Sequence, residues 1–253
     1  IKDIYYISKM LAGRWRKVLL GGTKSITIIR LTNLESVTNS KDGETIRRDI
    51  VRTYPTNPWF TPHIGKLSNI LNLYAYTNNG MGYAQGMAFI VFILYKVYHD
   101  DNPKHADKDT FYSFHKIINT IRPIYPLNKD DVSASVYVND LKQLVYMKIA
   151  VNHRRLALRL KSMPDIIPLV IYQCIPTLFG NKFNVDDAII IYDFIFMGEC
   201  TDMFHRAICI LCAIFISFEP VILTFQFEKV LEFIAVKEYY NVRKIISIAY
   251  TLL

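Results

Sequence analysis

Apolar residues recur along much of the chain at steps of three and four positions, the spacing that places them on one face of an α-helix. The clearest segments cover residues 64–74, 111–121 and 141–149. The first two carry Ile64, Leu67, Ile70, Leu71 and Tyr74, and Phe111, Phe114, Ile117, Ile118 and Ile121. This pattern predicts an all-α protein.

A few polar residues and prolines indicate where helices begin. Thr61-Pro62 has the form of an N-terminal cap followed by proline at the first helical position. Asp186-Asp187 supplies the negative charge that a helix start favours, so we expect the apolar run Ala188–Phe196 to be a buried helix. Ser25–Leu31 has the composition of one short strand, whereas Val242–Leu253 has that of a final helix. No regular series of strands and turns appears.

Length and composition narrow the class of protein. The 253 residues suit one large domain or two small ones, and 21% charged and 13% aromatic residues disfavour disorder. The longest apolar runs, Ala88–Tyr98 and Ala207–Phe218, are shorter than the roughly 18 residues that a membrane span needs. A net charge of +8 fits an acidic partner or a membrane surface. Because the first residue is Ile rather than Met, we expect a fragment of a longer protein.

The cysteines favour a structural role over metal binding. Cys209 and Cys212 form a CxxC pair, but no second pair or matched histidine pair completes a zinc site. We therefore expect both in an apolar core and no metal. So few cysteines, all in the C-terminal third, favour the cytosol over an oxidising compartment.

A basic stretch has two interpretations. His153-Arg154-Arg155 is followed by Arg159 and Lys161, and leucines are interleaved with these residues. The stretch is either a solvated helix face or a contact with anionic lipid, including phosphoinositides.

Two further segments carry unusual chemistry. Residues 46–60 place Asp49 three positions before Arg52, so one helical turn brings the carboxylate to the guanidinium. Residues 80–87 place Gln85 among glycines, directly before an apolar helix, where its amide can both donate and accept hydrogen bonds. No glycine-rich phosphate-binding motif is present, so the chain has no evident nucleotide site of its own.

Together these segments are similar to the two signature motifs of the TBC domain family, the Rab GTPase-activating proteins. Ile46, Asp49 and Arg52 occupy the positions of its IxxDxxR motif, with Ile46 as a supporting residue. Tyr83 and Gln85 occupy those of its YxQ motif. Weaker resemblances, interrupted by departures at Cys174 and Ile190, occur at Trp15, Thr177-Leu178-Phe179 and Tyr192-Asp193. We therefore expect residues 1–253 to form a single TBC domain.

The resemblance implies a V-shaped bundle of helices with a groove that receives the GTPase. It also implies two catalytic residues that are inserted into the partner, Arg52 as an arginine finger and Gln85 as a glutamine finger. Asp49 would then hold Arg52 in place, and Tyr83 would support the loop of Gln85. Arg48 would contact the GTPase or help to orient the site.

The implied partner is a small GTPase of the Rab family in its GTP-bound form. GTP and Mg²⁺ belong to that partner, so we expect no cofactor and no metal site on this chain. The expected location is the cytoplasm, with peripheral association with endomembranes. An alternative is a scaffold of the same fold that binds a GTPase without accelerating it. Binding of nucleic acid is disfavoured, because no recognition motif supports it.

Overall fold

The computed structural model describes residues 2–21, 41–78, 80–126, 132–199 and 202–253, with side chains from residue 9 onward. Within these ranges every regular element is an α-helix or a short 3₁₀-helix, which confirms the all-α prediction. The short strand considered at Ser25–Leu31 lies outside the described residues. Two compact units are present, residues 1–122 with 196–200, and residues 123–195 with 201–253. The V shape and the single domain over residues 1–253 stay predictions.

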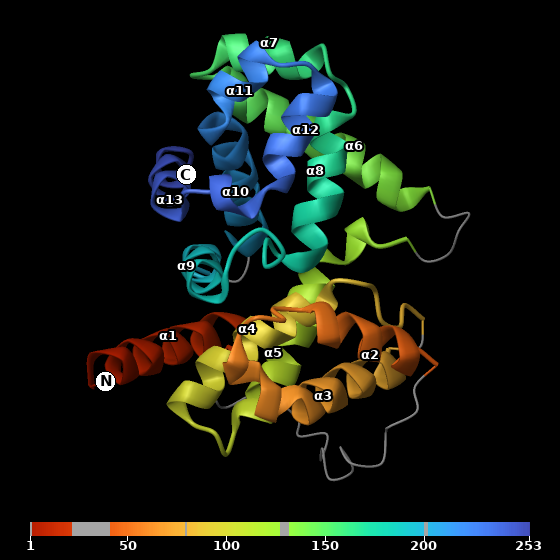
Figure 1. Ribbon diagram of the computed structural model, residues 1–253, viewed down its shortest axis with the longest axis vertical. Helices are drawn as coiled ribbons and strands as arrows, with labels where there is room; N and C mark the ends of the chain where they lie inside the picture. The colour runs from red at the N-terminus through yellow and green to blue at the C-terminus, as the bar shows by residue number, and fades with distance from the viewer. Residues whose placement is uncertain (1, 22–40, 79, 127–131, 200–201) are drawn as a thin grey trace. The chain divides into compact units, whose positions relative to one another are not determined.

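The first unit is assembled around a central helix, α4 (Met87–Asp101) (Figure 1). Residues 87–95 are apolar on every side of this helix, so it is stable only when it is covered all round. The helices that cover most of it are α1 (Lys2–Leu20), α3 (Ile64–Thr77) and α5 (Ala106–Ile121), and α2 (Gly43–Arg52) also contacts it. The short helices α2 and η1 (Pro58–His63) pack on α3. Because α4 begins at Met87, with Gly86 alone between it and Gln85, the best-packed helix of the unit anchors that loop.

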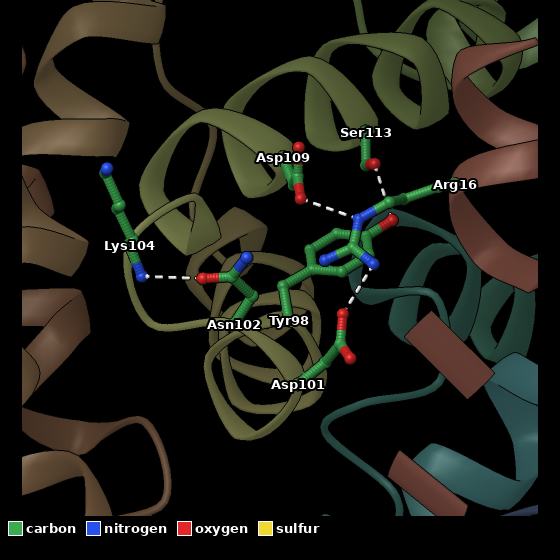
Figure 2. A network of polar contacts seen from close by, with 7 residues as sticks. All are labelled: Arg16, Tyr98, Asp101, Asn102, Lys104, Asp109 and Ser113. Carbon is green, nitrogen blue, oxygen red and sulfur yellow. Dashed lines mark hydrogen bonds and ion pairs between the residues drawn. The ribbon is translucent and has the colours of Figure 1, made fainter. Parts of the chain in front are cut away.

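Arg16 joins α1 to α4 and α5 through two ion pairs (Figure 2). Its Nε donates to Asp109 Oδ2 at 2.7 Å, and one Nη donates to Asp101 Oδ2 at 2.6 Å. The guanidinium lies over the ring of Tyr98, 5.1 Å from its centroid. Tyr98 Oη is in turn 2.7 Å from Ser113 Oγ. The three charged side chains are at most 19% exposed, so each charge depends on its partners in place of water.

The second unit is assembled around α10 (Met203–Ser217), whose residues from Ala207 to Ile216 are buried. Three helices that pack against α10 are α6 (Ser133–Ala150), α9 (Val185–Ile195) and α13 (Val242–Thr251). Other described elements are η2 (Arg122–Ile124), whose first residue belongs to the first unit, α7 (Arg154–Lys161), α8 (Ile166–Cys174), η3 (Ile175–Thr177), α11 (Glu219–Thr224), α12 (Phe227–Ala235) and η5 (Lys237–Tyr239). In the part of the chain that the structure describes, no helix combines the length and apolar character needed to cross a bilayer.

Of the two predicted helix starts, one is wrong and the other is confirmed. The start at Thr61-Pro62 is wrong, because both residues lie inside η1 and α3 begins only at Ile64. The side chain of Asn57 accepts a hydrogen bond from the backbone N–H of Trp59 at 3.1 Å, so the turn is capped further upstream. The acidic pair Asp186-Asp187 lies in the first turn of α9, as predicted.

Candidate functional site

Helix α2 carries the residues of the first motif on two opposite faces. Ile46 and Ile50 are 0% and 3% exposed, because apolar residues four positions apart share the face that packs on the unit. Asp49 lies beside them and is only 2% exposed. Arg48 and Val51 lie on the solvent face. The helix therefore buries one carboxylate while presenting its cations outward.

The carboxylate of Asp49 is the centre of the site. Its Oδ1 accepts a hydrogen bond from Arg52 Nε at 2.8 Å and lies 2.7 Å from an Nη atom of the same side chain. Its Oδ2 accepts from the backbone N–H of Gly86 at 2.7 Å and from the hydroxyl of Tyr83. A buried carboxylate is costly unless it is paired and hydrogen-bonded, and here both oxygens are satisfied. One side chain thus joins the end of α2 to the loop that carries Gln85.

Tyr83 is the main contact from that loop. Its side chain is buried, and burial, reinforced by the negative charge of Asp49, raises the pKa of its phenol far above the usual value. The phenol therefore remains protonated and can donate to Asp49. Its oxygen also accepts a hydrogen bond from the backbone N–H of Ala88 at 3.3 Å, in the first turn of α4.

Arg52 is the last residue of α2, and its side chain is 54% exposed. The helix ends abruptly after it. Thr53 Oγ1 donates to the backbone oxygen of Asp49 at 2.7 Å, and Tyr54 adopts a positive φ of 49°. Because residues with side chains rarely adopt this conformation, the packing of the buried Tyr54 ring on Phe60 must maintain it. This ending leaves the guanidinium at the surface, with one edge toward Asp49.

Gln85 lies between two residues that Asp49 holds, Tyr83 and Gly86. Its side chain is exposed and has no hydrogen-bond partner among the described residues. Gly86 has φ of 98°, a conformation that favours glycine, and it is followed directly by α4. The backbone around Gln85 is therefore fixed on both sides while its amide is available to another molecule.

The structure does not bring Arg48 to the same carboxylate. Its Nε donates to Glu44 Oε1 at 2.8 Å, and its side chain is 77% exposed. Glu44 also pairs with Arg47 on the same exposed face. The contacts thus give Arg48 no part in orienting Arg52, and its contact with a GTPase stays a prediction.

Sequence reasoning missed Asp42, the residue before α2. Its Oδ2 accepts a hydrogen bond from the backbone N–H of Tyr83 at 2.9 Å, across 41 positions of the chain. The only local signal is an acidic residue before Gly43, which is typical of a helix start. Nothing in the sequence relates it to the loop of Gln85.

Metal binding finds no support among the described residues, where no group of three or more His, Cys, Asp or Glu side chains could hold an ion. Cys209 and Cys212 are buried within α10, and burial raises the pKa of Cys212 to about 12. The expected absence of a cofactor stays a prediction.

Solved structures share the fold of this chain. The Ypt/Rab-GAP domain of Gyp1p aligns with a TM-score of 0.64 and 16% identity, over 96% of this chain and 80% of that one. The Chlamydomonas flagellar RabGAP TBC domain aligns with a TM-score of 0.69 and 16% identity, over 98% of this chain and 79% of that one. At this level of identity, the likeness establishes the fold.

Curated proteins are similar over part of the sequence. Human TBC1 domain family member 16 is 27% identical over 66% of this chain and 21% of its own length. Human TBC1 domain family member 13 is 27% identical over 58% of this chain and 37% of its own length. Mouse TBC1 domain family member 4 is 26% identical over 74% of this chain and 14% of its own length. The chain therefore spans well under half the length of these relatives.

The family profile matches a longer part of the chain than any of these three pairwise alignments does. The profile of the Rab-GTPase-TBC domain matches residues 23–223, a range that contains both signature motifs and most of the two units. The chain therefore belongs to the Rab-GTPase-TBC domain family.

Proposed function

We propose that this chain is a GTPase-activating protein for a Rab-type GTPase, and that Arg52 and Gln85 act in trans on the GTP of the partner. The observation that carries the proposal is the single carboxylate of Asp49. It bonds to Arg52 and also to the residues on both sides of Gln85. One buried group thereby holds the Arg52 side chain and the backbone on both sides of Gln85, two residues whose exposed side chains have complementary chemistry.

The chemistry of these side chains suits hydrolysis of GTP. A GTPase alone hydrolyses slowly because it lacks positive charge near the γ-phosphate and a well-oriented water. The guanidinium of Arg52 would supply that charge in a planar fork that matches phosphate oxygens. The amide of Gln85 can accept a hydrogen bond from the attacking water and donate one toward the phosphate. GTP and Mg²⁺ would both arrive with the Rab protein.

The proposal is tested by measuring phosphate release from a panel of GTP-loaded Rab proteins. For an accelerated Rab, Arg52→Ala should lower the accelerated rate by about 10³–10⁵-fold, the usual contribution of an arginine finger. Arg52→Lys should recover little, because an ammonium lacks the fork. Arg47→Ala is the matched control, since Arg47 lies on the same helix, is 73% exposed and pairs with Glu44. An Arg52→Ala protein as active as Arg47→Ala would refute the arginine finger.

Gln85 is tested with a Rab protein whose own catalytic glutamine is replaced by leucine. If Gln85 orients the water, the wild-type chain should still accelerate this Rab, and Gln85→Ala should abolish the acceleration. A substituted Rab that does not respond to the wild-type chain would refute the role of Gln85 and leave only that of Arg52. If the chain binds a GTP-loaded Rab but accelerates none, the alternative of a scaffold is correct.

We also propose peripheral association with membranes, through the exposed face of α7. Leu158 is 58% exposed, and on a helix it lies beside three exposed cations, Arg154, Arg155 and Lys161. No acidic residue occurs between Asp140 and Asp165 in the sequence. A leucine surrounded by cations suits the surface of an anionic bilayer. Through this contact the chain would act at the cytoplasmic surface of endomembranes.

Not all of the basic stretch is available for this contact. The Nε and one Nη of Arg159 donate to the backbone oxygens of Ile222 and Phe225, at 3.2 and 2.8 Å, near the end of α11. His153 Nδ1 lies 2.8 Å from Glu219 Oε2. These two residues therefore support the second unit, whereas Arg154, Arg155 and Lys161 are exposed, although Lys161 Nζ also lies 5.9 Å from the centroid of the Tyr146 ring.

Co-sedimentation with vesicles tests the membrane contact. Vesicles of phosphatidylcholine with phosphatidylserine should bind the wild-type chain, and vesicles of phosphatidylcholine alone should not. Arg154→Glu with Arg155→Glu should abolish binding, whereas the control Lys116→Glu, on the exposed part of α5, should leave it unchanged. Equal binding by both variants would refute the assignment to α7.

A further inference from the structure

Asp42 occupies the N-cap position of α2, yet its side chain does not cap that helix. The main-chain oxygen of Asp42 does take part in α2, because it accepts a hydrogen bond from the backbone N–H of Ile46 at 2.9 Å. The carboxylate instead reaches the other motif, where Oδ2 accepts from the backbone N–H of Tyr83 at 2.9 Å. At an N-cap, the side chain of aspartate usually accepts a hydrogen bond from a backbone N–H of its own helix, whereas here it bonds to a distant loop.

Gly82 makes room for this contact. Its φ is +67°, and a Cβ atom on it would lie 2.4 Å from Asp42 Oδ2. No such contact is tolerated, so the carboxylate occupies the space that any side chain at position 82 would need. The close fit means that the bond from Asp42 to Tyr83 depends on glycine at the preceding residue.

The loop of Gln85 is therefore attached to α2 at both ends of that helix. Asp49, near the end of α2, holds the Tyr83 hydroxyl and the Gly86 amide. Asp42, before its first turn, holds the main chain of Tyr83. Without Asp42, the hydrogen bond that still ties the chain before Gln85 to α2, among the described residues, would be that of the Tyr83 hydroxyl. The direction in which the backbone approaches Gln85 depends on this additional bond.

We propose that Asp42 is a positioning residue for Gln85, an inference that rests on the proposed function of the site. A carboxylate at a helix N-terminus is favoured by the helix dipole, and a charged acceptor makes a stronger hydrogen bond to a backbone N–H. The attachment is thereby present before any partner binds. A displacement of about 1 Å at a reacting group can cost about 10²-fold in rate, so loosening this end of the loop should lower turnover.

Hydrogen exchange measured by NMR tests the attachment on the chain alone. In Asp42→Ala, the amide of Tyr83 should exchange at least about tenfold faster, the effect of losing one hydrogen bond to a charged group. The amide of Gly86 is an internal control, because its acceptor is Asp49. Asp165→Ala is the matched variant, since Asp165 is the N-cap of α8 and likewise makes no side-chain cap bond. Unchanged exchange at Tyr83 in Asp42→Ala would overturn the inference.

Rates of GTP hydrolysis test the consequence for Gln85. Asp42→Ala should lower kcat about tenfold to a hundredfold with little change in KM, because the partner surface is intact while the amide is misplaced. Combined with Gln85→Ala, the same substitution should have no further effect. Asp42→Asn should recover part of the rate, because its amide oxygen can still accept from Tyr83. Equal losses in the presence and absence of Gln85 would show a general structural role and overturn the inference.

The two proposals can fail separately. A wild-type chain that accelerates no Rab protein overturns the proposed function, and with it any catalytic use of the attachment. The exchange measurement needs no GTPase, so it still decides whether Asp42 holds the loop. If acceleration is present and Asp42→Ala has the rate of the Asp165→Ala control, the proposed function stands and the role of Asp42 is refuted.

Discussion

Comparing Asp49→Ala with Arg52→Ala should separate the contribution of the site to stability from its contribution to catalysis, because Asp49 is the shared partner of the site. Asp49→Ala removes the acceptor of two buried donors, the hydroxyl of Tyr83 and the backbone N–H of Gly86. A buried polar group left without a partner costs about 1–3 kcal/mol, so the loss in free energy of unfolding should be about 2–6 kcal/mol. That is a large part of the roughly 5–15 kcal/mol by which a domain is usually stable.

Arg52→Ala should behave differently although it breaks a bond to the same carboxylate. The side chain of Arg52 is 54% exposed, whereas that of Asp49 is 2% exposed. Asp49 Oδ2 would keep its bonds to Tyr83 and Gly86, but Oδ1 would lose its bonds to the guanidinium. With one buried group left unpaired in place of two, the expected loss in stability is about 1–3 kcal/mol, while the accelerated rate should fall by about 10³–10⁵-fold.

Urea unfolding followed by far-UV circular dichroism compares the two variants with the wild type. Asp140→Ala is the control, because Asp140 is an exposed aspartate on α6 and should change stability by no more than about 0.5 kcal/mol. An Asp49→Ala protein within about 1 kcal/mol of the wild type would refute the reasoning. It would mean that water or a rearranged loop satisfies the two donors as well as the carboxylate does.

Two further predictions concern the first unit. Arg16→Leu removes the cation between Asp101 and Asp109, which are 11% and 15% exposed, and should lower the free energy of unfolding by about 2–3 kcal/mol. A loss below about 1 kcal/mol in urea unfolding would contradict this. Burial lowers the pKa of His63 and His99, so the unfolded chain binds protons at a higher pH than the folded one. Stability should therefore fall as the pH is lowered through about 6.5, and replacing both histidines with glutamine should flatten that dependence between about pH 7.5 and 5.5. Equal slopes for the two proteins would refute the assignment.

Much of this protein was determined by local sequence. The all-α class follows from apolar residues at three- and four-residue steps, because a helix can bury such residues on one face with no information from the rest of the chain. The acidic start of α9 is local in the same way, since the field of a helix end acts over a single turn. The pairing of Asp49 with Arg52 likewise needs only one turn of helix.

Two other features were decided by competition between groups close together in the sequence. The start of α3 was misplaced at Thr61-Pro62, because Asn57 accepts a hydrogen bond from a backbone N–H upstream and a 3₁₀-helix begins there. Arg48 was expected to contact the GTPase or to help orient the site. Glu44 pairs with it, so it does not orient Arg52, and its contact with a GTPase stays a prediction.

Only the tertiary structure decided how the two motifs are joined. The second oxygen of Asp49 bonds to Tyr83 and Gly86, and Asp42 holds Tyr83 from the other end of α2. These partners are separated by 34 to 41 positions, so no periodicity or spacing relates them. They meet because α4 is apolar on every side and must be covered, which brings α2 against the loop that precedes it.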